Sequence, residues 1–251
     1  MTARLLAMSL GCAAALAFGG AARAQTPEKA DATKADSSKA DPSNADDSKA
    51  VSKKADAKKA GPRPPRTETA TFGGGCFWCT EAVFERVPGV KSVVSGFSGG
   101  LVPNPTYQMV LTGETGHAEV VQIEFDPDKV SFEDLLHIFF KTHDPTTPNA
   151  QGPDFGTQYR SVIFFHGEEQ KKAALKVNQE MKAKRMFRSP VVTELVPFVA
   201  FYPAEMYHQD YFRNHPYEDY SQAYIVPKVR KLRSMLAAPA AKAAAKGPAA
   251  K

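Results

Sequence analysis

A five-residue repeat between residues 25 and 66 restricts the foldable part of the chain to the residues after it. The repeat runs from Lys29-Ala30-Asp31 through Lys34-Ala35-Asp36 to Lys59-Ala60-Gly61. A period of five matches neither the helix period nor the strand period, so no apolar stripe can form. The segment also contains almost no large apolar side chain that could be buried. Residues 25–70 are therefore predicted to be a disordered Lys/Ala/Asp linker.

The first 24 residues have the pattern of a secretory signal peptide. Arg4 precedes an apolar run over residues 5–18, and Ala22-Arg23-Ala24 follows it. A charged start, a short apolar stretch and an A-x-A ending are typical of such peptides, and the run is short for a membrane span. We expect residues 1–24 to be removed and the chain to be exported to a bacterial periplasm. In the mature chain we then expect no transmembrane segment. Lipidation of Cys12 is an alternative with a weaker signal.

The charge of the chain is unevenly distributed. The formal net charge is +5, yet residues 71–227 contain 13 Lys or Arg against 19 Asp or Glu. The foldable segment is therefore acidic, which argues against nucleic acid as a partner because no basic stripe remains. Residues 231–251 are rich in Ala and Lys and are predicted to be a disordered basic tail, although residues 228–236 can form a last helix.

Strand-like and helical patterns alternate within residues 71–230. Runs of β-branched residues, or of alternating apolar and polar residues, predict strands at 69–72, 90–96, 118–125, 159–165 and 191–196. Helical spacing predicts helices at 76–87, 132–140 and 168–186, with helical turns at 106–111 and 202–212. Strands and helices mixed without strict βαβ repetition indicate a single α+β domain in which helices pack on a sheet.

A glycine-rich segment with two cysteines joins the first predicted strand to the first predicted helix. Its sequence is Phe72-Gly73-Gly74-Gly75-Cys76-Phe77-Trp78-Cys79. Cys76 is thus expected at a helix N-terminus, where unpaired N–H groups and the helix dipole stabilise an anion. This placement predicts a lowered pKa and a thiolate at Cys76. Cys79, three residues on, is expected on the same helix face and within disulfide reach.

Several interpretations of this cysteine pair remain open from its spacing alone. A structural zinc site would need two more ligands of similar spacing, and the sequence has no second Cys-x-x-Cys pair. A permanent structural disulfide would close so short a loop that it would add little stability. A thioredoxin-like dithiol enzyme carries the same Cys-x-x-Cys pattern after a strand.

The order of motifs around and after this segment resembles the A-type methionine sulfoxide reductases. The resemblance covers about residues 69–220. Its segments are Gly75-Cys76-Phe77-Trp78, Asn104-Pro105-Thr106-Tyr107, Thr115-Gly116-His117-Ala118-Glu119, His143-Asp144-Pro145-Thr146, Asp154-Phe155-Gly156-Thr157-Gln158-Tyr159-Arg160-Ser161 and Tyr207-His208-Gln209.

The resemblance implies a fold, a reaction and a set of site residues. The fold is a two-layer α/β sandwich with a ferredoxin-like mixed sheet. The reaction is reduction of methionine S-sulfoxide, free or in proteins, by a monomer that needs no cofactor and no metal and is recycled by a thioredoxin-like protein. In the implied roles, Cys76 is the nucleophile, and Phe77 and Trp78 hold the substrate methyl group. Glu119 protonates the sulfoxide oxygen. Tyr107 and Tyr159 donate hydrogen bonds to the same oxygen, and Asp154 is a supporting polar residue.

Physical chemistry agrees with these roles and adds one requirement. A sulfoxide sulfur is a weak electrophile, so its oxygen must gain a proton from a positioned acid. For Glu119 to be that acid near neutral pH, burial must raise its pKa. The histidines at positions 117, 143 and 208 receive no role from the sequence.

The chain departs from the family pattern in its cysteines. Many members carry recycling cysteines near the C-terminus, where residues 217–220 lie here, but this chain has no cysteine after Cys79. We therefore expect Cys79 to be the resolving cysteine, which forms a disulfide with the Cys76 sulfenic acid. The alternative function is a dithiol–disulfide oxidoreductase that acts on protein cysteines.

Overall fold

The computed structural model describes residues 66–245. The expected signal peptide and nearly all of the expected linker lie outside the described residues, as do residues 246–251. The folded part begins at strand β1 (Glu68–Gly74), which starts within the last residues of the predicted linker. Within the described part, no helix is both long and apolar enough to cross a membrane.

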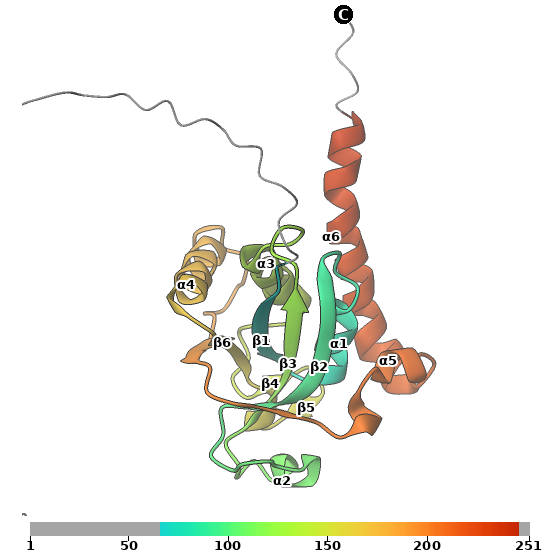
Figure 1. The fold of residues 1–251 in the computed structure, drawn as a ribbon. Coiled ribbons are helices and arrows are strands. Elements are labelled where there is room, and N and C mark those ends of the chain that lie inside the picture. The colour runs from blue at the N-terminus through green and yellow to red at the C-terminus, as the bar shows by residue number, and fades with distance from the viewer. Residues whose placement is uncertain (1–65, 246–251) are drawn as a thin grey trace, which may run out of the picture. The chain divides into compact units, whose positions relative to one another are not determined.

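Six strands form one mixed sheet in the order β7-β6-β1-β3-β2-β8 (Figure 1). Neighbouring strands run antiparallel, except that β6 and β7 are parallel. The other strands of the sheet are β2 (Val90–Ser98), β3 (Ala118–Phe125), β6 (Ser161–Phe165), β7 (Glu194–Pro197) and β8 (Phe201–Pro203). A separate short hairpin pairs β4 (Ala150–Gln151) with β5 (Asp154–Phe155).

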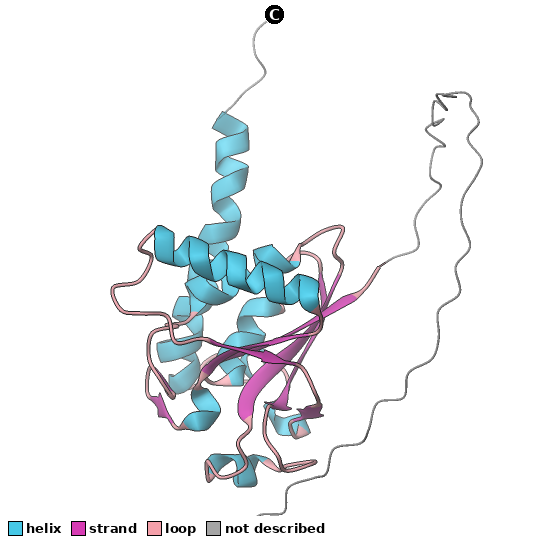
Figure 2. Cartoon of the chain, turned by 90° about the vertical axis from the view of Figure 1, so that its left-hand side faces the viewer, coloured by secondary structure: helices cyan, strands magenta, loops and turns pink. Residues whose placement is uncertain are grey.

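Four helices form a layer over one face of this sheet, in which the first three contact strands and the last packs mainly on other helices (Figure 2). They are α1 (Phe77–Phe84), α3 (Phe132–Thr142), α4 (Glu168–Ala183) and α6 (Val226–Ala245). Shorter pieces lie in the connections: α2 (Tyr107–Leu111), α5 (Tyr211–Asn214), 3₁₀ turns at Thr157–Tyr159 and Met206–His208, and a π-helical turn at Ser221–Ile225.

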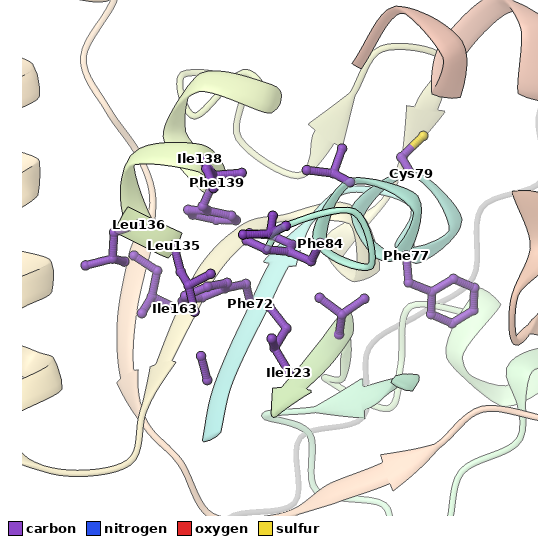
Figure 3. Packing of buried hydrophobic residues seen from close by; sticks show 14 of the residues in the cluster. Phe72, Phe77, Cys79, Phe84, Ile123, Leu135, Leu136, Ile138, Phe139 and Ile163 are labelled. Atoms are coloured by element: carbon purple, nitrogen blue, oxygen red, sulfur yellow. The ribbon is translucent and has the colours of Figure 1, made fainter. Parts of the chain in front are cut away.

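The alternation of side chains along the strands explains the two layers. Phe72 of β1 and Ile123 of β3 face the helices and belong to the main core (Figure 3). Val120 and Phe164 point to the opposite face, where a small second cluster forms. The expected single α+β domain, with helices packed on a mixed sheet, is confirmed. Figure 3 also shows Cys79 at the edge of the core, with its sulfur pointing away from the phenylalanines.

Two predicted segments differ from the structure. The first part of the segment predicted as helical turns at 202–212 is instead the edge strand β8, which pairs with β2. A Cβ at Gly96 would collide with the Tyr202 carbonyl, so the glycine lets β8 approach closely. Helix α6 continues to Ala245, beyond residue 231 where the disordered tail was predicted to begin. Val229 and Leu232 anchor this helix in the core, and its alanines favour helix.

The strand order brings four chain segments to one end of the sheet. Because β1 runs antiparallel to β3 and β6, the end of β1 lies beside the starts of β3 and β6. The end of β2 lies there as well, because β2 is antiparallel to β3. Segments far apart in sequence therefore meet where β1 leads into α1 (Figure 1).

Replacement of Phe72 by alanine tests the core. The Phe72 ring is fully buried and lies 5.1 to 5.7 Å, between ring centroids, from Phe139, Phe84 and Phe132. We expect Phe72→Ala to lower the free energy of unfolding by about 3–5 kcal/mol, because a cavity remains. Leu101→Ala, at a side chain that is 96% exposed, should change it by about 0.5 kcal/mol or less. Urea unfolding measures both, and equal midpoints for the two variants would contradict this packing.

Candidate active site

A glycine-dependent turn places Cys76 at the meeting point of the strand ends. Gly75 has φ +89°, a conformation that side-chain-bearing residues rarely adopt, and a Cβ there would collide with Gln151. Cys76 follows as the N-cap of α1, and its carbonyl accepts a hydrogen bond from the Cys79 N–H at 3.1 Å. Both cysteines are buried free thiols. The structure thus confirms the predicted position of Cys76 at the start of the helix.

Glu119 lies directly against the start of this helix. It is the second residue of β3, its side chain faces the helical layer, and it is 1% exposed. The Phe77 N–H donates a hydrogen bond to Glu119 Oε2 at 3.0 Å. Burial raises the pKa of Glu119 to about 8, although the Phe77 hydrogen bond opposes the shift. Glu119 is therefore largely protonated at neutral pH, which confirms the expected burial shift.

The ionisation expected for Cys76 is wrong. Burial raises the pKa of Cys76 well above that of an ordinary thiol, and the neighbouring Cys79 and Glu119 add to the shift. The first free N–H of α1 is used by Glu119 and not by the sulfur. A hydrogen bond from Cys76 lowers the pKa of Cys79 to about 7, against the effect of burial. The pKa shifts of the two thiols therefore run in opposite directions.

Tyr107 and Tyr159 add two hydroxyl groups beside Glu119. Burial, followed by the charge of Glu119, raises the pKa of Tyr107 to about 12 and that of Tyr159 further still. The neighbouring Tyr159 hydroxyl has the opposite, smaller effect on the pKa of Tyr107. The Thr106 side chain caps α2, and the Tyr107 N–H donates to Glu205 at 3.0 Å, which holds Tyr107 in place. Both hydroxyls thus keep their protons and are available as donors.

Phe77 and Trp78 build an aromatic cluster next to Cys76. Phe77 is 1% exposed, whereas Trp78 is half-buried. The Trp78 ring stacks on Tyr211 with a centroid distance of 3.6 Å and an interplanar angle of 5°. Its Nε1–H donates to His208 Nδ1 at 3.2 Å, which gives His208 a positioning contact that the sequence did not predict. These contacts fix the orientation of an apolar surface beside the sulfur.

Asp154 contacts Tyr220, a residue of the site that was not predicted from the sequence. The Tyr220 hydroxyl donates to Asp154 Oδ2 at 2.8 Å and lies 3.9 Å from Cys79 Sγ. Burial raises the pKa of Asp154 and that of Tyr220. The segment around Tyr220 was considered in the sequence only as a place for a recycling cysteine. No motif marks it, because its position depends on how α6 folds back.

All eight predicted site residues belong to one connected cluster. A cavity of about 30 Å³ opens beside it and is lined by Cys76, Cys79, Gln151, Gly152, Pro153, Asp154, Tyr220, Tyr224 and Lys228. Within residues 66–245, no three His, Cys, Asp or Glu side chains converge as a metal site would require.

Two of the unassigned histidines have structural contacts instead. His143 Nδ1 contacts the Phe139 carbonyl at 2.6 Å and Nε2 contacts Ser161 Oγ at 2.8 Å. Burial lowers the pKa of His143 to about 3, so the ring is neutral. His117 Nδ1 accepts from the Gly100 N–H at 3.0 Å, which closes the loop after β2. Both rings satisfy buried backbone groups.

Comparisons with known proteins agree with this geometry. The family model described as "Peptide methionine sulfoxide reductase" matches residues 68–239. Curated relatives with the name "Peptide methionine sulfoxide reductase MsrA" include one from Sulfolobus acidocaldarius, 60% identical over 166 residues, covering 65% of this chain and 92% of the relative. Another, from Polynucleobacter asymbioticus, is 56% identical over 170 residues, covering 68% of this chain and 90% of the relative.

Solved structures agree as well. Reduced Mxr1 from Saccharomyces cerevisiae superposes with a TM-score of 0.58 at 34% identity, covering 64% of this chain and 92% of that one. Methionine sulfoxide reductase A of Corynebacterium diphtheriae superposes with a TM-score of 0.55 at 36% identity, covering 62% of this chain and 78% of that one. Since the family model spans well over half of the residues, the chain belongs to the peptide methionine sulfoxide reductase family.

Proposed function

We propose that this oxidoreductase reduces methionine S-sulfoxide, free and in proteins, with Cys76 as the nucleophile and Glu119 as the proton donor. The observation that carries the proposal is the buried Glu119 carboxyl, held by the Phe77 N–H beside Cys76. Its pKa of about 8 makes it an acid at neutral pH. Oxygen transfer from a sulfoxide needs such an acid, because the oxygen must be protonated before sulfur is attacked.

The first half-reaction moves one oxygen atom from the substrate to Cys76. Glu119 protonates the sulfoxide oxygen, and the Tyr107 and Tyr159 hydroxyls stabilise the developing charge. The Cys76 sulfur attacks and gives up its proton, so methionine and a Cys76 sulfenic acid result. The neighbouring Cys79, whose pKa is lowered to about 7, is an acceptor for that proton. Phe77 and Trp78 offer the apolar surface on which the substrate methyl group rests.

The second half-reaction regenerates the thiols. Cys79 attacks the Cys76 sulfenic acid, a disulfide forms and water leaves. A thioredoxin-like dithiol protein then supplies two electrons through thiol–disulfide exchange. The support for Cys79 in this role is its lowered pKa and its place in the first turn of α1, three residues after Cys76.

The alternative function, a dithiol–disulfide oxidoreductase, leaves the rest of the site without a purpose. Thiol–disulfide exchange needs thiolates and no carboxylic acid next to an aromatic surface.

For cellular context we propose an exported, periplasmic monomer. The support is the signal-peptide pattern of residues 1–24, together with the repeat that comes after it as a spacer. Expression of the full chain in a bacterial host, with fractionation and mass spectrometry of the N-terminus, should find a periplasmic protein that begins at Gln25. An intact Met1 in the cytoplasmic fraction would refute export, and gel filtration of the mature chain tests the monomer.

The two cysteine variants should separate the half-reactions. Cys79→Ser should still release about one methionine per enzyme, because the oxygen can still move to Cys76, but should lose turnover with a dithiol protein reductant. Cys76→Ser should release none above background. Methionine release in single and multiple turnover measures both. Unchanged recycling in Cys79→Ser would exclude Cys79 as the resolving cysteine, and an active Cys76→Ser would refute the mechanism.

Glu119 should impose a pH dependence on the first half-reaction. Its protonated form is the active one, so the rate of methionine release should decline as pH rises through about 8. Glu119→Gln should lower the rate at neutral pH by about 10²–10⁴-fold and abolish this decline. Glu124→Gln, an exposed carboxyl on the same strand, is the matched control and should leave the profile unchanged. The measurement is the single-turnover rate of methionine release across neutral and alkaline pH. If Glu119→Gln kept the decline at alkaline pH, the titrating group would be one other than Glu119.

A further inference from the structure

Lys228 borders two small spaces next to Cys79, and the mechanism above gives it no role. It is the one cationic side chain among the described residues that line the cavity shared by Cys76, Cys79, Asp154 and Tyr220. A second cavity of about 10 Å³ is also lined by Lys228 and Cys79, together with His143. The same cation therefore borders both of the free spaces that Cys79 lines.

The fold explains how a lysine comes to be here. Tyr220, Tyr224 and Lys228 all line the first cavity, and they are spaced at four-residue intervals through the π-helical turn and into α6. Residues four apart in a helix share a face. Val229, next along the helix, is buried in the core and holds this face toward Cys79. Among residues 66–245, no carboxylate forms an ion pair with Lys228, so its charge is not neutralised there.

We propose that Lys228 is a positioning residue for the resolving step: its ammonium group stabilises the Cys79 thiolate that attacks the Cys76 sulfenic acid. This inference rests on the proposed function, because it presupposes that Cys79 resolves Cys76. In the step, the S–S bond forms and the S–O bond of the sulfenic acid breaks. The Cys76 sulfur is reduced and the Cys79 sulfur is oxidised. The leaving hydroxide takes up one proton from solvent and departs as water, which balances the proton that Cys79 has released to solvent.

Tyr220 offers a route for that proton. Its hydroxyl lies 3.9 Å from Cys79 Sγ and donates to Asp154 Oδ2 at 2.8 Å. Asp154 is half-buried and neighbours the exposed Gly152 and Pro153, so it can exchange protons with water. A proton that leaves Cys79 can therefore pass through Tyr220 toward solvent while Lys228 holds the thiolate.

The other groups around Cys79 do not make Lys228 redundant. The groups that face Cys79 from each neighbouring element are Cys76 before α1, His143 after α3, Asp154 of β5, and Tyr220 and Lys228 of the last helical segment. The hydrogen bond from the Cys76 thiol lowers the pKa of Cys79 most, burial opposes it, and Lys228 is the next group that lowers it. Once Cys76 is a sulfenic acid, that thiol donor no longer exists. His143 is neutral and Asp154 raises the pKa, so Lys228 is the cation that remains.

The test uses the full chain and three lysine variants. Lys228→Met removes the charge and keeps much of the side-chain length, and Lys228→Arg restores the charge. Lys231→Met removes a charge one turn further along α6, at an exposed side chain, and is the matched control. Two quantities are measured against pH: the thiolate absorbance of the reduced enzyme, and the rate of Cys76–Cys79 disulfide formation after one equivalent of methionine S-sulfoxide. Thermal unfolding checks that each variant is folded.

In Lys228→Met we expect the first thiolate to form at higher pH, and disulfide formation at pH 7 to slow by about fivefold, as a rise of about one pKa unit implies. The amount of methionine released per enzyme should stay the same. Lys228→Arg and Lys231→Met should match the parent profile. Parent-like profiles in Lys228→Met would overturn the inference, as would an equal shift in Lys231→Met. Failure of the parent enzyme to form the Cys76–Cys79 disulfide would instead refute the proposed function.

Discussion

The hydrogen bond from the Phe77 amide to the Glu119 carboxyl joins two segments 42 residues apart, and the site depends on it. The first free N–H of α1 meets a side chain at the start of β3 because β1 and β3 pair antiparallel, so that one ends where the other begins. The bond fixes the carboxyl next to Cys76 while burial keeps it protonated. The helix dipole favours an ionised carboxylate at this helix start. Desolvation has the larger effect on Glu119 and raises its pKa.

Burial sets the protonation states of the whole cluster. Charged forms are costly in this region, so Glu119 holds its proton and Cys76 remains a thiol. Cys79 differs because the neighbouring Cys76 thiol, and then Lys228, lower its pKa against the effect of burial. A pair of interacting thiols titrates as a unit, and the surroundings decide which sulfur carries the first charge.

Much of the fold was predictable from local patterns. The β-branched run at 90–96 and the alternation at 118–125 are the central strands β2 and β3, and the glycine-rich turn before Cys76 does lead into a helix. The edge strand β8 could not be recognised, because its three residues have no periodicity and exist as a strand through pairing with β2 beside Gly96. Helix α6 runs past its predicted end, since the burial of Val229 and Leu232 is a tertiary effect.

The order and type of residues along the chain were enough to predict which groups lie together in the site: the Gly-Cys-Phe-Trp-Cys segment and the later Glu119, Tyr107, Tyr159 and Asp154. How those groups ionise, and which unmarked residues join them, depends on packing in three dimensions. The shift in a pKa depends on burial and on neighbours in space, and neither is encoded in local spacing. For that reason the pKa of Cys76 is raised where a lowered value was expected, and Tyr220 and Lys228 enter the site only when α6 packs beside α1.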